Sequence, residues 1–89
     1  SIPQVIKEAF FLQVPVIATN VGGIPELISN NITGLLVPPE NPEAMTDAIN
    51  KLLSDNNTKQ KLSKNAFKFI NKNFSWDVLI EKYIKLYES

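Results

Sequence analysis

Two short apolar runs limit what this chain can fold into. Residues 14–19 read "VPVIAT" and residues 35–37 read "LLV", and neither run alternates polar with apolar positions. Uninterrupted runs of this kind are typical of strands that are buried on both faces of a parallel sheet. Segments with helical periodicity lie before, between and after the two runs, so the order of elements predicts βαβ units in an α/β layer architecture.

Helix signals flank these strands. Ser1 and Gln4 fit a capping box, and Asn41 followed by Pro42 is a typical helix start. Apolar residues surround most of the first helix, which predicts that it is buried. The predicted helices cover residues 3–12, 24–29, 42–55 and 57–72 and a final segment that is capped by Ser75.

The sheet that the sequence predicts is incomplete. Two strands do not form a stable sheet alone, and strands of the buried type need neighbours on their edges and helices on both faces. The 89 residues are therefore interpreted as a piece of a larger doubly wound α/β domain. No apolar stretch approaches the roughly 20 residues that a membrane helix needs.

Composition restricts the chemistry and the partners. The chain contains neither histidine nor cysteine, so the side chains available for chemistry are carboxylates, hydroxyls and lysines. The N-terminus lacks the pattern of a secretory signal, which predicts a cytoplasmic protein. Five lysines between residues 59 and 72 face no carboxylate in that stretch. A solvated helix face explains them better than a nucleic-acid site, because arginine is missing, while contact with anionic lipid remains an alternative.

The sequence "TNVGG" marks a candidate site. In open α/β sheets, ligands bind beyond the carboxyl ends of the strands, where loops lead into helices. Gly22 and Gly23 can adopt positive φ and allow a ligand to approach the backbone, and the amides of the following helix can offer donors. The alternative is a tight turn without a ligand, because a single glycine pair does not match the dinucleotide fingerprint.

The remaining candidate ligand-binding residues are one carboxylate and the residues at a helix start. Glu8 lies on the most polar strip of the first helix, and its two oxygens could accept hydrogen bonds from vicinal hydroxyls of a ribose. An isolated helix glutamate can equally be just solvated. Ser1, Ile2 and Pro3 form a helix N-terminus whose dipole suits a phosphate group, although every helix has such an end.

Four motifs together resemble one protein family. They are E-A at residues 8–9, P-V-I-A-T at 15–19, G-G-I-P-E at 22–26 and T-G-L-L-V-P-P at 33–39. This combination is similar to the C-terminal end of retaining, nucleotide-sugar-dependent glycosyltransferases of the GT-B fold, the large group 1 or family four. The resemblance covers nearly all of the chain and implies the C-terminal portion of a Rossmann-like, doubly wound domain that becomes helix-rich toward its C-terminus.

The resemblance also implies roles for single residues. The family motif has two glutamates separated by seven residues; Glu8 takes the second position, and the first falls immediately before Ser1. Glu8 would bind the ribose of a UDP- or GDP-sugar, and the backbone of residues 1–3 would lie near its diphosphate. Gly22, Gly23 and Glu26 resemble the loop below the donor site, with Glu26 serving either the helix start or the ligand.

Further implications concern the whole enzyme. No bound metal or other cofactor is expected, and the chain alone should be an inactive fragment without a catalytic residue of its own. The helix of residues 76–87 would pack on an N-terminal domain. The lysines between residues 59 and 72 leave peripheral association at the inner face of the membrane open. The competing hypotheses are a non-catalytic α/β binding or interaction module of the same fold and a dinucleotide-cofactor site.

Overall fold

The computed structural model describes residues 1–74, and in this range it confirms the predicted order of elements. The final helix, predicted after Ser75, lies outside the described residues. The elements are α1 (Ile2–Phe11), β1 (Ile17–Thr19), α2 (Ile24–Leu27), β2 (Leu35–Val37), α3 (Pro42–Ser54) and α4 (Asn56–Asn73).

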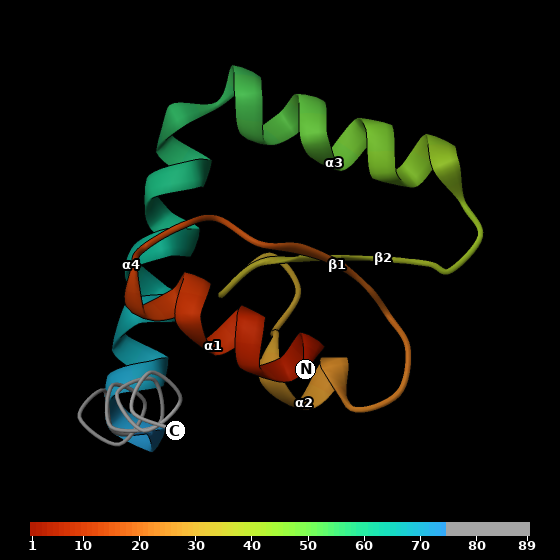
Figure 1. The fold of residues 1–89 in the computed structure, drawn as a ribbon. Coiled ribbons are helices and arrows are strands. Elements are labelled where there is room, and N and C mark those ends of the chain that lie inside the picture. Colours follow the sequence, from red (N-terminus) through yellow and green to blue (C-terminus); the bar gives the residue numbers. More distant parts are fainter. Residues whose placement is uncertain (75–89) are drawn as a thin grey trace, which may run out of the picture.

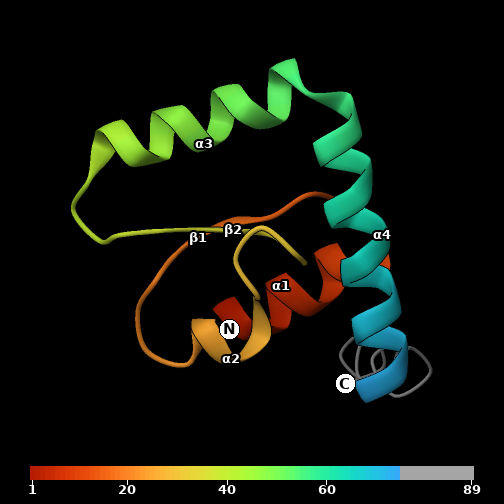
Figure 2. The same cartoon turned by 180° about the vertical axis from the view of Figure 1, so that it is seen from behind.

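The two strands form the predicted parallel pair. Ile17 lies opposite Leu35, and Thr19 lies opposite Val37. Helices α1 and α2 lie on one face of the pair and α3 lies on the other (Figures 1 and 2). Helix α4 runs along one end of these layers and contacts both α1 and α3. The β1–α2–β2 segment is therefore the βαβ unit that the sequence predicts.

The core has two parts, and α4 belongs to both. Ala66 and Ile70 of α4 pack between α1 and α2, whereas Leu62 packs between β2 and α3. The lysines of α4 point outward and are exposed, as their spacing predicts. The first cluster consists of Ile6, Phe10, Phe11, Ile24, Ile28, Ala66 and Ile70; the second consists of Leu35, Val37, Ala48, Leu52 and Leu62.

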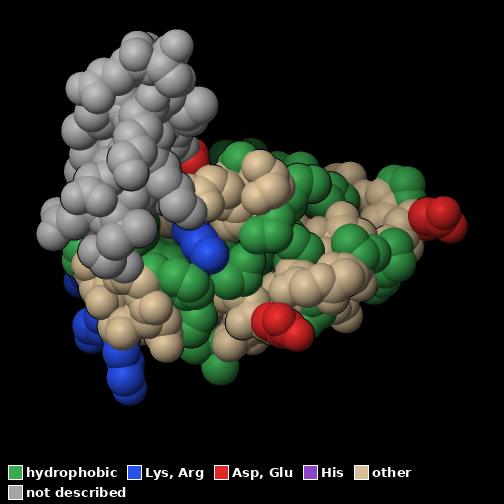
Figure 3. Space-filling model, turned by 60° about the horizontal axis from the view of Figure 1, so that its bottom comes forward, with side chains coloured by type: hydrophobic (Ala, Val, Ile, Leu, Met, Phe, Trp, Pro, Cys, Tyr) green, Lys and Arg blue, Asp and Glu red, His purple; other side chains and the backbone are tan. Residues whose placement is uncertain are grey.

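The prediction that α1 is buried on most sides is wrong for the described residues. Ile6, Phe10 and Phe11 are buried, but Ile2 and Val5 are 68% and 60% exposed. The reason is that α2, α4 and the strand pair cover one side of α1, while Ile2 and Val5 lie on a side that residues 1–74 leave exposed. Hydrophobic side chains accordingly occupy much of the face that Figure 3 shows.

The strand β1 is likewise less buried than its composition predicts. All three of its residues are half-buried, whereas Leu35 and Val37 of β2 are buried. Helix α3 shows the same partial cover, because Ile49 is 43% and Leu53 80% exposed although both belong to its apolar stripe. Apolar composition predicts which residues can be buried, and the neighbours present decide which of them are.

Local hydrogen bonds fix the helix ends. The Ser1 hydroxyl accepts from the Gln4 N–H at 3.4 Å, and the Asn41 side chain accepts from the Ala44 N–H at 3.0 Å, which confirms both predicted caps. At the start of α4, Asp55 accepts from the Thr58 hydroxyl at 2.7 Å and from the Thr58 N–H at 3.1 Å. The hydroxyl bond, followed by the backbone bond, holds the pKa of Asp55 below its ordinary value.

Helix α1 ends in a Schellman motif that has no glycine. The Val14 N–H donates to the Ala9 carbonyl at 2.9 Å and the Gln13 N–H to the Phe10 carbonyl at 3.2 Å. This closure requires a left-handed residue, and Gln13 adopts φ +57. The position is one that glycine or asparagine usually occupies.

The turn of residues 30–34 carries the most crowded glycine of the described chain. A Cβ atom on Gly34 would lie 2.9 Å from the Val16 carbonyl oxygen and 3.1 Å from Cγ2 of Ile28. Gly34 therefore allows the backbone of this turn to touch the segment that leads into β1. The predicted turn is confirmed, and its glycine is required by close packing.

Candidate functional site

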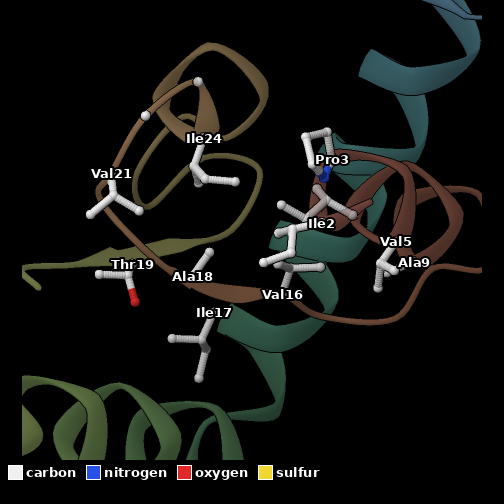
Figure 4. A pocket seen from close by; sticks show the side chains of 13 residues that line it. Ile2, Pro3, Val5, Ala9, Val16, Ile17, Ala18, Thr19, Val21 and Ile24 are labelled. Carbon is white, nitrogen blue, oxygen red and sulfur yellow. The ribbon is translucent and has the colours of Figure 1, made fainter.

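An apolar pocket of about 590 Å³ lies between α1, β1 and the loop that follows β1 (Figure 4). Its walls come from α1 between Ile2 and Ala9, from residues 16–19, from the glycine loop (residues 20–23) and from Ile24 of α2. The side chains of Ala18, Ile24 and Ile2 face its interior from three different elements. The only hydroxyl side chain in its lining is that of Thr19, at the carboxyl end of β1.

The glycine loop, residues 20–23, is held at the carboxyl end of the strand pair. The Asn20 N–H donates to the Val37 carbonyl at 2.8 Å, and the Val21 N–H donates to the Thr19 carbonyl at 2.9 Å. Gly22 adopts φ +53, as expected for a glycine that is needed for its conformation, whereas Gly23 has φ −83 and could be another residue. A Cβ on either glycine would meet nothing within 4 Å, so the loop leaves open space beside its backbone.

The expectation that the amides at the start of α2 are available to a ligand is wrong. The Ile24 N–H donates to the Val21 carbonyl at 3.1 Å, and the Glu26 N–H donates to the Gly23 carbonyl at 3.1 Å. Pro25 has no N–H. The loop amides that make no hydrogen bond within residues 1–74 are those of Gly22 and Gly23, so the donors offered to a ligand precede the helix.

The N-terminus of α1 also offers fewer donors than a typical helix. The Gln4 N–H donates to the Ser1 hydroxyl, and the Val5 N–H donates to the Ser1 carbonyl at 3.1 Å. Pro3 has no N–H, so the amide of Ile2 is the one that remains at the first turn. Ile2 and Pro3 both line the pocket, as Gly22 and Gly23 of the glycine loop do.

Glu8 lies apart from the pocket. It is half-buried on α1, one turn from Val5 and from Leu12, which are 60% and 65% exposed. Its carboxylate therefore belongs to the uncovered side of α1. Of the seven predicted site residues, Ile2, Pro3, Gly22 and Gly23 line the pocket, whereas Ser1, Glu8 and Glu26 do not.

Sequence reasoning missed Thr19 and Val21 as pocket residues. Their signal is positional, because residues at the carboxyl end of a parallel strand face the usual ligand crevice. Residues 1–74 contain no cluster of three carboxylates that could hold a metal ion. Within the same range, no helix combines the length and the apolar character that a membrane span requires.

The parallel strand pair, the helices on both faces and the loop beyond the strands define the class of fold. The chain has the fold of the C-terminal portion of a Rossmann-like GT-B domain. Sucrose-phosphate synthase from Thermosynechococcus elongatus is 34% identical and superposes with a TM-score of 0.76 over 94% of this chain and 21% of that protein. The Anabaena protein HepE, in complex with UDP and glucose, is 25% identical with a TM-score of 0.77 over 96% and 23%.

Sequence comparison identifies the family. Residues 1–69 match the family described as "Glycosyl transferases group 1", and the chain belongs to this family. A D-inositol 3-phosphate glycosyltransferase of Corynebacterium glutamicum is 36% identical over 83 residues, which are 93% of this chain and 20% of that enzyme. An uncharacterized glycosyltransferase of Methanocaldococcus jannaschii is 30% identical over 84 residues. The chain thus spans about a fifth of the length of these relatives.

Proposed function

We propose that this chain is the donor-binding part of an enzyme that transfers a sugar from a nucleotide sugar to an acceptor with retention of anomeric configuration. The observation that carries the proposal is the convergence of two backbone segments on one pocket, in a chain that belongs to the group 1 glycosyl transferases. Residues 2–3 reach the pocket from α1, and Gly22 and Gly23 reach it from the loop after β1.

The available donors suit a negatively charged or hydroxyl-bearing ligand. The unpaired amides of Gly22 and Gly23 adjoin open space, and the Ile2 amide lies at the positive end of α1. The solved relative HepE binds UDP and glucose, which supports a nucleotide-sugar donor for this chain. The free backbone amides would stabilise the negative charge that develops on a departing diphosphate. This stabilisation requires neither histidine nor a metal.

Glu8 is proposed to bind the ribose of the donor. Its place on the uncovered side of α1 leaves its carboxylate accessible, and its two oxygens can accept from both ribose hydroxyls. A donor would have to extend from the helix start along α1 to reach it, because Glu8 does not line the pocket. Glu26 is assigned to the start of α2, where a carboxylate is favoured by the helix dipole.

The test of the ribose contact is Glu8→Gln in the full-length enzyme. Glutamine keeps the shape and the helix propensity but loses the charge that strengthens both hydrogen bonds. Because hydrogen bonds to charged groups contribute about 1.5–3 kcal/mol, we expect donor affinity to fall about tenfold or more. Calorimetric titration with UDP- and GDP-sugars measures this affinity, and thermal unfolding shows whether folding is unchanged.

The matched control is Glu43→Gln, which removes an exposed carboxylate from the first turn of α3. Its donor affinity should equal that of the unchanged enzyme. Equal affinities for the Glu8 and Glu43 variants, with both proteins folded, would show that Glu8 has no ribose contact.

The alternative function is a non-catalytic α/β binding or interaction module of the same fold. Incubation of the full-length protein with nucleotide sugars and candidate acceptors separates the two, because only an enzyme releases free nucleotide with a glycosylated product. Nuclear magnetic resonance of that product reports the retained or inverted configuration. We further propose that the enzyme is cytoplasmic and associates peripherally with the inner face of the membrane. We also propose that this chain is inactive without its N-terminal domain.

A further inference from the structure

A polar pocket lies at the opposite end of α1 from the glycine loop. It has a volume of about 500 Å³ and lies between the end of α1 and the first half of α4. It shares no lining residue with the apolar pocket beside β1. All of its described lining residues are polar: Gln13, Asn56, Lys59, Gln60, Ser63 and Lys64. The two pockets therefore differ in both place and chemistry.

Helical spacing and the closure of α1 position these polar groups. Residues 56, 59, 60, 63 and 64 recur at the spacing of one helix face, so α4 presents their side chains on the same side. Gln13 reaches the same pocket from the Schellman motif after α1, where its N–H donates to the Phe10 carbonyl at 3.2 Å. Helix α1 packs directly on α4 (Figure 1). The lining groups thus belong to well-defined parts of the fold.

Ser63 is the buried member of this set, with 8% of its surface exposed. A serine inside a helix can donate to the carbonyl four residues earlier, as the Ser54 hydroxyl does to the Asn50 carbonyl at 2.7 Å. The Ser63 hydroxyl makes no hydrogen bond within residues 1–74. No enclosed side-chain oxygen or nitrogen of the described residues lacks a partner, so this hydroxyl is reached from the pocket that Ser63 lines. It can therefore bond to a ligand in the pocket.

The charges and the donors of the pocket favour an anion. Lys59 and Lys64 are its charged side chains, and its described lining includes no carboxylate. Asp55, the nearest carboxylate along the chain, accepts hydrogen bonds from the N–H and the hydroxyl of Thr58. Ammonium groups donate hydrogen bonds only, and side-chain amides and hydroxyls can donate as well. A phosphate monoester fits this set, because it carries about 1.5 to 2 negative charges and several acceptor oxygens.

We propose that the pocket between α1 and α4 binds a phosphate monoester group. Lys59 and Lys64 balance its charge, since lysine binds phosphate as a point charge. The Ser63 hydroxyl donates a hydrogen bond from the buried side of the pocket and fixes the position of the group. The side-chain amides of the other lining residues bond its remaining oxygens. The phosphate belongs either to a small soluble molecule or to a lipid headgroup, and both present the same chemistry to the pocket.

Titration of the full-length protein with inorganic phosphate tests this site. Nuclear magnetic resonance of protein that carries isotopically labelled glutamine follows the titration, because Gln13 and Gln60 both line the pocket. Gln4, in the first turn of α1, is the reference outside it. Saturable shifts of the Gln13 and Gln60 signals are expected. Shifts that increase without saturation would overturn the proposal.

Paired lysine variants separate the pocket from the general charge of α4. Lys59→Met combined with Lys64→Met should abolish saturation, because methionine keeps an unbranched stem and loses the charge. The matched control is Lys61→Met with Lys68→Met, which removes the same charge from exposed lysines outside the pocket and should leave phosphate affinity unchanged. Equal phosphate affinities of the two folded double variants would contradict a defined site.

Ser63→Ala tests the buried hydrogen bond. Alanine fits the helix and removes only the hydroxyl, so thermal unfolding should be unchanged. Phosphate affinity should fall about two- to tenfold, as expected for the loss of one hydrogen bond. Unchanged affinity in this variant would show that the Ser63 hydroxyl does not contact the phosphate and would overturn its proposed role.

Vesicle sedimentation distinguishes the two sources of the phosphate. Vesicles of phosphatidylcholine with phosphatidic acid present a monoester headgroup, and vesicles of phosphatidylcholine alone are the blank. Binding that is lost in the Lys59 and Lys64 double variant and retained in the control variant supports a lipid headgroup. Equal vesicle binding of the two variants, with their difference in affinity for inorganic phosphate preserved, supports a soluble phosphate ester. These measurements involve no nucleotide sugar, so this proposal and the proposed function can fail independently.

Discussion

The glycine pair after β1 and the single glycine before β2 differ in the physical reason for which the fold requires glycine. Gly22 and Gly23 are conspicuous in the sequence, yet a Cβ on either would meet open space. Gly34 follows an ordinary turn sequence, yet its Cβ would lie 2.9 Å from a backbone oxygen. Gly22 is needed for its positive φ, Gly34 for its lack of a side chain, and Gly23 for neither reason. Glycines near one another in a chain can thus be present for different physical reasons.

The substitution expected to have the largest effect is Gly34→Ala. The new methyl group would press on the Val16 carbonyl, which accepts the Leu35 N–H and cannot move without disturbing the β1–β2 pairing. Overpacking in a well-packed site costs about 1–3 kcal/mol, so unfolding in urea should begin at a clearly lower concentration. An unfolding midpoint like that of the unchanged protein would mean that the turn can shift freely.

Gly22→Ala should destabilise by a different mechanism and by a smaller amount. The methyl group has space, but φ +53 places a non-glycine residue in the left-handed region, at a cost of about 1–2 kcal/mol. Donor binding should weaken with stability, because the loop that would relax carries two of the pocket's free amides. Urea unfolding and donor titration of the same variant measure the two effects. Full stability with weakened binding would indicate that the residue acts only at the ligand.

Gln13→Gly is the opposite kind of substitution, because it adds a glycine at a position whose backbone is left-handed. Gln13 adopts φ +57 in the Schellman motif after α1, so glycine relieves the left-handed strain but raises the entropy of the unfolded chain. The net result should be a stabilisation of about 1 kcal/mol or less. Gln13→Ala, which retains the strain, is the control and should show no gain in urea unfolding. Equal stability of the two variants would argue against the left-handed conformation.

Gly23→Ala should have the smallest effect. Gly23 has φ −83 and open space around its Cβ position, so alanine fits without strain and restricts the unfolded chain. A stabilisation of about 0.5 kcal/mol is expected, from the range found for compatible sites. The change in stability is most informative when it is compared with that of Gly22→Ala, because the two positions are neighbours in one loop. A loss of stability equal to that of Gly22→Ala would remove the distinction between them.

Much of the fold could be predicted because its signals are local. The caps at Ser1 and Asn41, the apolar stripe of α4 and the two strand segments depend on residues within a few positions of one another. The pairing of β1 with β2 in parallel followed from the helix between them. For the site, the sequence singled out residues 2–3 at a helix start and the glycine pair at a carboxyl strand end, and the structure brings both to one pocket.

The sequence by itself determined the type of each element, their order and the family to which the chain belongs. Only the tertiary structure decided that Gly34 is crowded, that the amides of Ile24 and Glu26 are already bonded and that Glu8 lies outside the pocket. It also decided that the Asn30 side chain accepts from the Leu36 N–H of β2 and that, among residues 1–74, β2 is the strand paired with β1. The physical reason is that capping and periodicity depend on neighbours in sequence, whereas crowding, bonding and exposure depend on atoms brought close by folding.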